Sequence, residues 1–326
     1  MQFQLSFNIK RSLSDICHSD AVMLCGSCFT ENIGSKMSGA KMNICMNPQG
    51  ILFNPMSIAN CLEACMDNKE YNANELFQHN EIWNHWDFHS RFSGTDKDVV
   101  LSEMNRSIKK GNNFLKQADW LIITFGSSYQ YFLSASNDII GVGNCHKAPG
   151  NWFEKRMLDI DEMQQRWQQT LDKLKVFNPN LKIIFTISPV RHYRDGLAEN
   201  NLSKARLFEL IYRLADKKEH LQYFPAFEIV NDVLRDYRFF EQDMVHPNHQ
   251  ATQFVWEQFV KTYFNDTDIN LSRQIEDIIT ALNHRPRFKE TSAHQRFQEG
   301  VKQKIVSLKG KFPYLNFDEE MHQMQY

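Results

Sequence analysis

Three short, almost continuous apolar runs alternate along the chain with longer segments of helical periodicity. The runs are rich in bulky and β-branched side chains and cover residues 21–25, 118–126 and 181–190. Such runs are typical of central strands in a parallel sheet, because both faces of that sheet are covered. Helical patterns occur at residues 56–66, 102–118, 161–177 and 202–218. The alternation predicts an α/β fold made of strand–helix–strand units around an open parallel sheet.

The character of the sequence changes after about residue 266. Residues 269–288 form one amphipathic helical pattern, and the remainder is polar. We therefore expect a main α/β domain at residues 1–265 and a helical C-terminal extension at residues 266–326. We expect the extension to pack on the core or on a second subunit, so that it could form a homo-oligomer.

The charge balance bears on the class of partner. The chain has 326 residues and a net charge of −2, so no strong field attracts nucleic acid or an anionic membrane. The first 15 residues lack the apolar core of a signal peptide, and no run of about 18 apolar residues could span a membrane. We therefore expect a cytoplasmic protein, with its seven cysteines as free thiols.

Polar and reactive residues follow three of the predicted strands. Ligands of open α/β sheets bind outside the carboxyl ends of the strands. The residues at those ends are Gly26, Ser27 and Cys28, then Gly126, Ser127 and Ser128, and finally Pro189, Arg191 and His192. We expect the functional site at this edge of the sheet.

Ser27 and Cys28 stand at a predicted strand-to-helix turn. Unpaired N–H groups at a helix start can bind an oxyanion, and the helix dipole lowers a thiol pKa. A base is indicated by DMVHPN, in which Asp243 precedes His246 by three residues. A carboxylate that orients an imidazole is what activation of a nucleophile requires. The order of these residues favours nucleophilic catalysis; the alternative is that Ser27 only caps the helix and Cys28 packs inward.

Further motifs occur in the same order along the chain. They are GSCFT at 26–30, NPQGILFNPMSI at 47–58, WDFHSRFS at 86–93, ITFGSSYQY at 123–131, NCHK at 144–147, SPVRHYRDG at 188–196 and the segment at 223–248 that ends in DMVHPN. Over roughly residues 15–265, this set resembles the GSCFA family of the SGNH (GDSL-type) hydrolases. The resemblance implies a three-layer, doubly wound, flavodoxin-like parallel sheet of the SGNH-hydrolase type. It also implies that residues 1–265 form a catalytic domain.

The resemblance also implies a nucleophile. The superfamily signature Gly-Asp-Ser-Leu, laid on GSCFT without a gap, puts Cys28 at the nucleophile position and Ser27 where the aspartate normally stands. Ser27 would be the nucleophile only if the turn were shifted by one residue. Asp243 and His246 match the terminal block of the superfamily without change.

The oxyanion hole departs from the superfamily pattern. In the second block a glycine N–H is a donor, and Gly50 in NPQG is the matching residue; the alternative is a plain turn glycine. Ser128 stands where the third block has an asparagine, and its hydroxyl is shorter than an amide. Asn144 or His146, both from NCHK, could replace that donor.

Three histidines are candidates for substrate binding together with Asn144. His89 lies among aromatic residues, where a hydrogen-bonded structural histidine is the alternative. His146 lies in a cluster that could bind a polar or anionic group, and ordinary loop structure is its alternative. His192 follows a predicted strand and is expected near the active edge.

Three other functions compete with nucleophilic catalysis. Cys25-x-x-Cys28 has the spacing of disulfide oxidoreductases, although Cys25 is expected to point into the core. Cys25, Cys28, Cys145 and His146 could form a zinc site, although the last two are adjacent in sequence and awkward as tetrahedral ligands. A catalytically inactive binding protein could also keep the fold, because fold does not fix function.

The main hypothesis is acyl-group chemistry on an ester or thioester through a covalent acyl-enzyme on Cys28. The expected partner is a small-molecule or glycan acyl ester, an acetylated glycan by superfamily analogy, and not nucleic acid or membrane. No cofactor and no metal are implied. Hydrolysis and acyl transfer fit these residues equally, because they differ only in whether water or another acceptor takes the acyl group.

Overall fold

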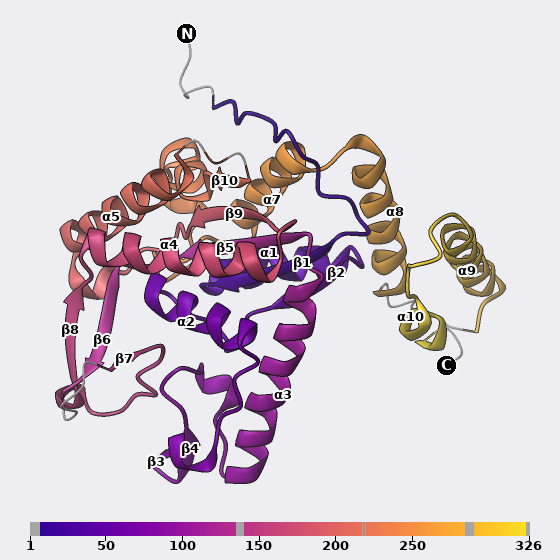
Figure 1. The fold of residues 1–326 in the computed structure, drawn as a ribbon. Coiled ribbons are helices and arrows are strands. Elements are labelled where there is room, and N and C mark those ends of the chain that lie inside the picture. Colours follow the sequence, from indigo (N-terminus) through magenta and orange to yellow (C-terminus); the bar gives the residue numbers. More distant parts are fainter. Residues whose placement is uncertain (1–6, 135–139, 217, 219, 284–289, 324–326) are drawn as a thin grey trace.

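The computed structural model describes residues 7–134, 140–216, 218, 220–283 and 290–323 (Figure 1). At its centre is a five-stranded sheet in the order β2-β1-β5-β9-β10, and every neighbouring pair is parallel. Its strands are β1 (Ala21–Gly26), β2 (Asn43–Met46), β5 (Trp120–Phe125), β9 (Lys182–Ile187) and β10 (Leu221–Phe224). The chain leaves β1 toward β2 on one side and later adds β5, β9 and β10 on the other. This is the doubly wound, flavodoxin-like order that we predicted, with its switch point between β1 and β5.

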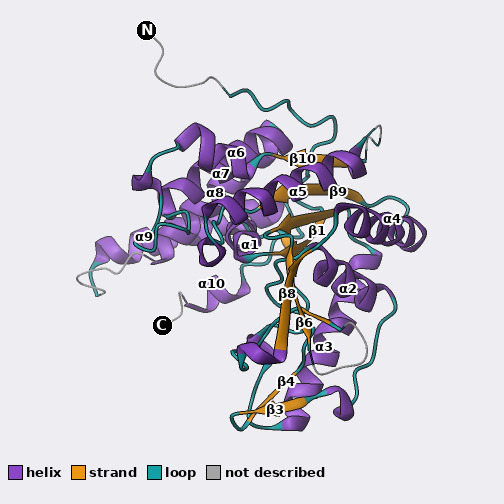
Figure 2. Ribbon diagram, turned by 90° about the vertical axis from the view of Figure 1, so that its left-hand side faces the viewer, coloured by secondary structure: helices purple, strands orange, loops and turns teal. Residues whose placement is uncertain are grey.

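Helices cover both faces of the sheet (Figure 2), and the resulting three layers confirm the predicted fold class. One face packs on α2 (Pro55–Met66), α3 (Lys97–Lys116), α4 (Ile160–Phe177) and α5 (Leu197–Ala215). The other packs on α1 (Cys28–Gly39), α6 (Ala226–Glu228) with the adjoining π-helical turn η5 (Ile229–Leu234), and α7 (His249–Tyr263). Along β1, Met23 and Cys25 enter the first cluster and Val22 and Leu24 the second. All six β1 residues are buried, which explains the uninterrupted apolar run.

Two small antiparallel elements extend from the sheet. One is the hairpin β3 (Phe77–His79) and β4 (Ile82–Asn84). The other is a three-stranded sheet of β6 (Tyr129–Leu133), β7 (Gly141–Val142) and β8 (Phe153–Met157), in the order β7-β6-β8. In Figure 1 the hairpin lies at the bottom, beside the lower end of α3, and the three-stranded sheet lies at the lower left. Single 3-10 turns connect these parts: η1 (Ala73–Glu75), η2 (Ser90–Phe92), η3 (Gly150–Trp152), η4 (Tyr193–Asp195) and η6 (Tyr237–Phe239).

Three helices follow the last core helix: α8 (Asp266–Asn283), α9 (Ser292–Lys311) and α10 (Asp318–Gln323). They form the predicted helical extension, drawn at the right of Figure 1, and share an apolar cluster that includes Ile275 and Ile305. An ion pair of 2.6 Å between Lys41 and Glu320 joins this cluster to the core. The predicted helix at 269–288 begins at Asp266, and residues 284–288 lie outside the described residues. Within the described ranges, no helix combines the length and apolar character needed to cross a membrane.

Candidate active site

A pocket of about 650 Å³ opens at the carboxyl ends of the strands, beside the switch point. Loops after three strands line it, as the rule for open sheets requires. The strands β6 and β8 contribute the side chains of Tyr129, Tyr131 and Lys155. The loops contribute Ser27 and Cys28 after β1, Ser127 after β5, Ser188 and residues 190–195 after β9, and Asp243, Val245 and His246 before α7. Segments far apart in the sequence therefore meet in one cavity.

The structure distinguishes between Ser27 and Cys28. Ser27 is 1% exposed and caps α1, where its Oγ accepts the N–H of Phe29 at 3.3 Å. Its own N–H donates to Thr124 O of β5 at 3.3 Å. Cys28 is the first residue of α1 and is partly exposed in the pocket. The sulfur, and not the hydroxyl, is therefore the atom available to a ligand.

Gly26 makes the turn between β1 and α1. Its φ is +146°, and a Cβ at this position would lie 2.3 Å from Thr124 O. Any other residue would push β1 away from β5, because the obstacle is backbone. This close approach places Cys28 directly outside the end of β1.

The environment of the Cys28 sulfur has opposing effects on its pKa. Burial raises the pKa of the thiol, whereas hydrogen bonds from the backbone N–H groups of Phe29 and Cys28 lower it. The Glu31 carboxylate raises the pKa and the Lys204 ammonium lowers it, and the net change is upward. Cys28 is thus a thiol near neutral pH, so attack on a carbonyl requires a base.

Asp243 and His246 supply a base of the required form. The imidazole Nδ1 lies 2.6 Å from Asp243 Oδ2, while Oδ1 accepts the N–H groups of Val245 at 2.9 Å and of His246 at 3.0 Å. These backbone bonds, with the imidazole bond after them, lower the pKa of Asp243 to about 2. The carboxylate therefore accepts the proton on Nδ1, which leaves the Nε2 lone pair free to take a proton.

The two predicted oxyanion donors, Gly50 and Ser128, lie outside the pocket lining. The N–H of Gly50 donates to Asn47 O at 2.8 Å, and a Cβ at this position would lie 2.2 Å from His89 Cβ. Ser128 is fully buried, and both its N–H (2.8 Å) and its Oγ (3.0 Å) donate to Ser203 Oγ. Backbone and helix partners already use these donors, and the oxyanion roles of Gly50 and Ser128 stay predictions. The start of α1 at Cys28 is a helix N-terminus, whose unpaired N–H groups are of the kind that can bind an oxyanion.

The four predicted substrate-binding residues fall into two groups. Asn144 and His192 line the pocket, whereas His89 and His146 do not. The Nδ1 of His89 accepts the N–H of Arg91 at 3.3 Å, and the Nε2 of His146 lies 2.8 Å from His85 O. These hydrogen bonds fit the alternatives of a structural histidine for His89 and ordinary loop structure for His146, and their substrate-binding roles stay predictions. Burial, followed by the nearby Lys204 charge, lowers the pKa of His192 to about 4, so this imidazole is neutral at pH 7.

Polar residues of α5, which were not predicted from the sequence, lie behind the pocket and hold its loops. Asn200 accepts the N–H of His192 at 2.9 Å, Ser203 accepts the bonds from Ser128, and Lys204 binds two carbonyls at strand ends. Their spacing of three and four residues continues the buried face that includes Leu207. Polar residues in register with an apolar helix face were the available signal.

The arrangement of cysteines bears on the redox and zinc hypotheses. Cys25 is buried in the core, where its sulfur hydrogen-bonds with Cys61, whereas Cys28 faces the pocket. Both are free thiols. Of the proposed zinc ligands only Cys28 and Cys145 line the pocket, and in the described part of the chain no group of three or more His, Cys, Asp or Glu is arranged to hold a metal ion.

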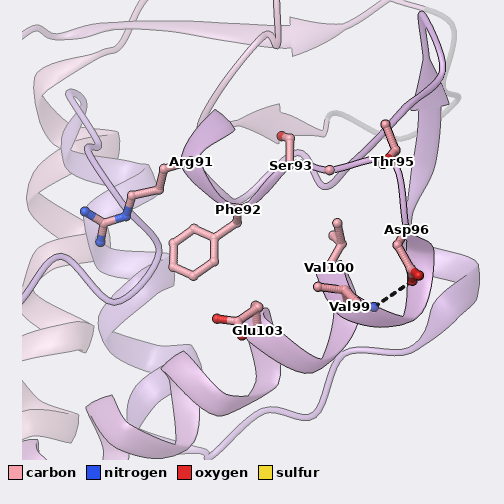
Figure 3. A pocket seen from close by; sticks show the side chains of 9 residues that line it. Arg91, Phe92, Ser93, Thr95, Asp96, Val99, Val100 and Glu103 are labelled. Atoms are coloured by element: carbon pink, nitrogen blue, oxygen red, sulfur yellow. Dashed lines mark hydrogen bonds between the residues drawn. The ribbon is translucent and has the colours of Figure 1, made fainter.

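A second concavity, of about 420 Å³, lies between η2 and the start of α3 (Figure 3). Asp96 caps α3 there by accepting the Val99 N–H at 3.0 Å. The Arg91 guanidinium bonds to Glu31 at 3.0 Å. No cysteine or histidine lines this concavity. The pocket at the strand ends is therefore the candidate active site.

Comparisons with known proteins give two family matches and several structural likenesses. The model of the GSCFA family matches residues 21–259, and that of the GSCFA domain protein, C-terminal domain, matches residues 275–325. A carbohydrate esterase family 3 from Talaromyces cellulolyticus is 12% identical with a TM-score of 0.35, covering 79% of this chain and 99% of that chain. The Clostridium thermocellum family 3 carbohydrate esterase is 10% identical with a TM-score of 0.33 and the same coverage.

An acetyl xylan esterase from the rumen bacterium Butyrivibrio proteoclasticus is 12% identical with a TM-score of 0.37, covering 76% of this chain and 63% of that chain. No curated protein sequence matches the chain. The GSCFA model spans most of the 326 residues, including the GSCFT turn and the Asp243–His246 pair. The chain therefore belongs to the GSCFA family.

Proposed function

We propose that this protein is an SGNH-like esterase or acyltransferase that uses Cys28 as its nucleophile. The observation that carries the proposal is the meeting of two features in one pocket. A partly exposed thiol stands at a helix N-terminus, and an imidazole oriented by a carboxylate lines the same cavity. Together they provide a nucleophile, a base and a helix start that can bind an oxyanion.

In the first half of the reaction, His246 Nε2 takes the proton from Cys28 Sγ, and the thiolate attacks the carbonyl carbon of the ester. The oxyanion accepts the N–H of Cys28 at the start of α1. When the tetrahedral intermediate collapses, the bond to the leaving alcohol breaks and His246 protonates that alcohol. Asp243 remains ionised throughout, because its low pKa keeps the proton on the imidazole.

In the second half, water or a hydroxyl acceptor attacks the thioester, and His246 takes its proton. The free acid or the new ester leaves, and the proton returns to Cys28. We propose a small-molecule or glycan acyl ester as substrate, because the pocket of about 650 Å³ is open and mixes aromatic with charged walls. The acceptor is proposed to reach the intermediate through the same opening.

A panel of p-nitrophenyl esters and acyl thioesters tests this function. Wild type should turn over at least one of them, whereas Cys28→Ala and His246→Ala should lose turnover. Ser27→Ala should keep the chemistry at a cost in stability of about 1 kcal/mol, because only a helix cap is lost. Cys17→Ala is the matched thiol control, because Cys17 is exposed outside the pocket. Full activity in Cys28→Ala would refute the proposal, and no turnover across the panel would favour an inactive binding protein.

A further inference from the structure

Arg191 is a cation in the wall of the candidate active site. It lies in the loop after β9, is partly buried and lines the pocket. Its backbone N–H donates to Val245 O at 3.3 Å. Val245 stands between Asp243 and His246 in the sequence, so this bond joins Arg191 to the loop that carries the proposed base.

Two aromatic rings hold the guanidinium group of Arg191. Its Cζ lies 5.4 Å from the centre of the Tyr237 ring and 4.5 Å from the centre of the Phe240 ring. A cation–π contact leaves the N–H donors without an oxygen acceptor. Among the described residues, no carboxylate forms an ion pair with Arg191. The rings therefore fix the position of the charge, and its donors remain open to a ligand.

Three cations and two carboxylates line the pocket: Lys155, Arg191, Arg194, Asp195 and Asp243. Both carboxylates have partners, because Asp195 pairs with Lys155 and Asp243 is bound to His246. Neither arginine has a carboxylate partner in the part of the chain that the structure describes. The lining thus has an excess of positive charge, located on two guanidinium groups.

The two arginines differ in their exposure to solvent. Arg194 is exposed, whereas Arg191 is partly buried. Solvent and salt screen a partly buried charge less, and burial without an opposite charge costs free energy. A guanidinium group presents paired N–H donors that match two oxygens of a carboxylate or a phosphate. An anionic group of a ligand in the pocket would supply the partner that Arg191 lacks.

We propose that Arg191 is a specificity-determining residue that binds an anionic group, a carboxylate or a phosphate, of the acyl ester. While the anionic group accepts the guanidinium N–H groups, the ester carbonyl reaches Cys28 in the same pocket. The inference rests on the function proposed above and adds the charge of its substrate. The anionic group belongs either to the acyl part or to the alcohol part of the ester, and the substrates used in the test distinguish the two.

The first test measures the effect of the charge without turnover. Cys28 is alkylated with anionic iodoacetate and with neutral iodoacetamide, which are nearly equal in size, and each product is followed by peptide mass spectrometry. Both reagents attack the same thiolate, so the ratio of their rates cancels any change in the pKa or the exposure of the thiol. In Arg191→Gln the iodoacetate-to-iodoacetamide ratio at Cys28 should fall about fivefold, because a cation of the pocket is lost. The ratio at the exposed Cys17 should not change.

Arg238→Gln is the matched control. Arg238 also contacts an aromatic ring, with its Cζ 5.2 Å from the centre of Phe239, but it does not line the pocket. This variant should leave the ratio at Cys28 unchanged. Arg194→Gln should lower the ratio less than Arg191→Gln does, because Arg194 is exposed.

A folded Arg191→Gln variant with the wild-type ratio at Cys28 would overturn the inference. An equal or larger fall in Arg194→Gln or in Arg238→Gln would also overturn it. If Arg191→Gln does not fold, wild type decides. Its ratio at Cys28 should exceed the ratio for free N-acetylcysteine, and an equal or lower ratio would refute the inference.

Two matched pairs of esters locate the anionic group. The pair p-nitrophenyl hydrogen adipate and p-nitrophenyl hexanoate differs in the charge of the acyl part. The pair p-acetoxybenzoate and methyl p-acetoxybenzoate differs in the charge of the alcohol part. In at least one pair, kcat/KM of wild type should be about tenfold higher for the anionic ester, and Arg191→Gln should lose this preference.

The outcomes separate this inference from the proposed function. Turnover of both pairs with no preference for the anionic ester in either would overturn the inference and leave the esterase function standing. No turnover of any ester, together with the expected fall of the alkylation ratio in Arg191→Gln, would support Arg191 as an anion-binding residue and count only against the proposed function.

Discussion

Gly26→Ala perturbs the turn that positions the proposed nucleophile. The added Cβ would lie 2.3 Å from Thr124 O and 2.9 Å from Thr124 N, and the backbone φ of +146° is one that alanine rarely adopts. Strain of this kind costs about 1–3 kcal/mol, and overpacking against a fixed backbone costs about the same again. We expect a total near 4 kcal/mol, which lowers the melting temperature by about 10 °C.

The assay is a thermal melt followed by circular dichroism, together with acyl labelling of the folded protein. Gly39→Ala is the matched control on the same helix, because a Cβ there meets nothing within 4 Å. We expect Gly39→Ala to be neutral or slightly stabilising, since alanine favours helix. Gly26→Ala should also lose labelling at Cys28 below its melting temperature. Equal melting temperatures for the two variants would refute the close approach of β1 and β5 at this turn.

Three further predictions concern the base, a pocket histidine and the C-terminal helices. Asp243→Asn should lower the rate of acylation by about 100-fold or more, because the imidazole loses its orienting carboxylate. In wild type the carboxylate stays ionised down to about pH 4, since its pKa is lowered to about 2. A loss of rate between pH 7 and pH 5 that is traced to protonation of Asp243 would contradict this ionised state. His192→Gln should leave the shape of the pH–rate profile between pH 5 and 8 unchanged, because a pKa of about 4 keeps His192 neutral there. If the variant loses a pH-dependent change of rate that wild type shows in this range, His192 is the titrating group and the prediction fails. Lys41→Met should destabilise the protein by about 3 kcal/mol in chemical denaturation, because it leaves the Glu320 carboxylate buried and unpaired; no change would show that the pair does not anchor the helices.

The central fold could be predicted from the sequence because its strands are buried on both faces. The apolar runs at 118–126 and 181–190 contain the strands β5 and β9. Observed helix starts differ from the predicted ones by up to five residues. Asp96 caps α3 at Lys97, ahead of the predicted start at 102. The strand β2 was not predicted, because it is an edge strand of four residues with only one buried side chain. The division at residue 265, the homo-oligomer and the cytoplasmic location remain predictions.

The site could be predicted only in part. Strand ends and the Asp-x-x-His spacing led to Cys28, Asp243, His192 and His246, all of which line one pocket. The sequence could not show that the N–H groups of Gly50 and Ser128 are already hydrogen-bonded within the fold. Lys204 was missed because a lysine in a helical pattern is normally taken as solvent-exposed.

The most direct test of the central claim is to find where the acyl group attaches. Wild-type protein is mixed with p-nitrophenyl acetate, quenched in acid and mapped by peptide mass spectrometry. A single acetyl group on Cys28, absent from Cys28→Ala and from His246→Ala, is the predicted result. Acetylation of Ser27 in wild type, or turnover of p-nitrophenyl acetate by Cys28→Ala at the wild-type rate, would contradict it.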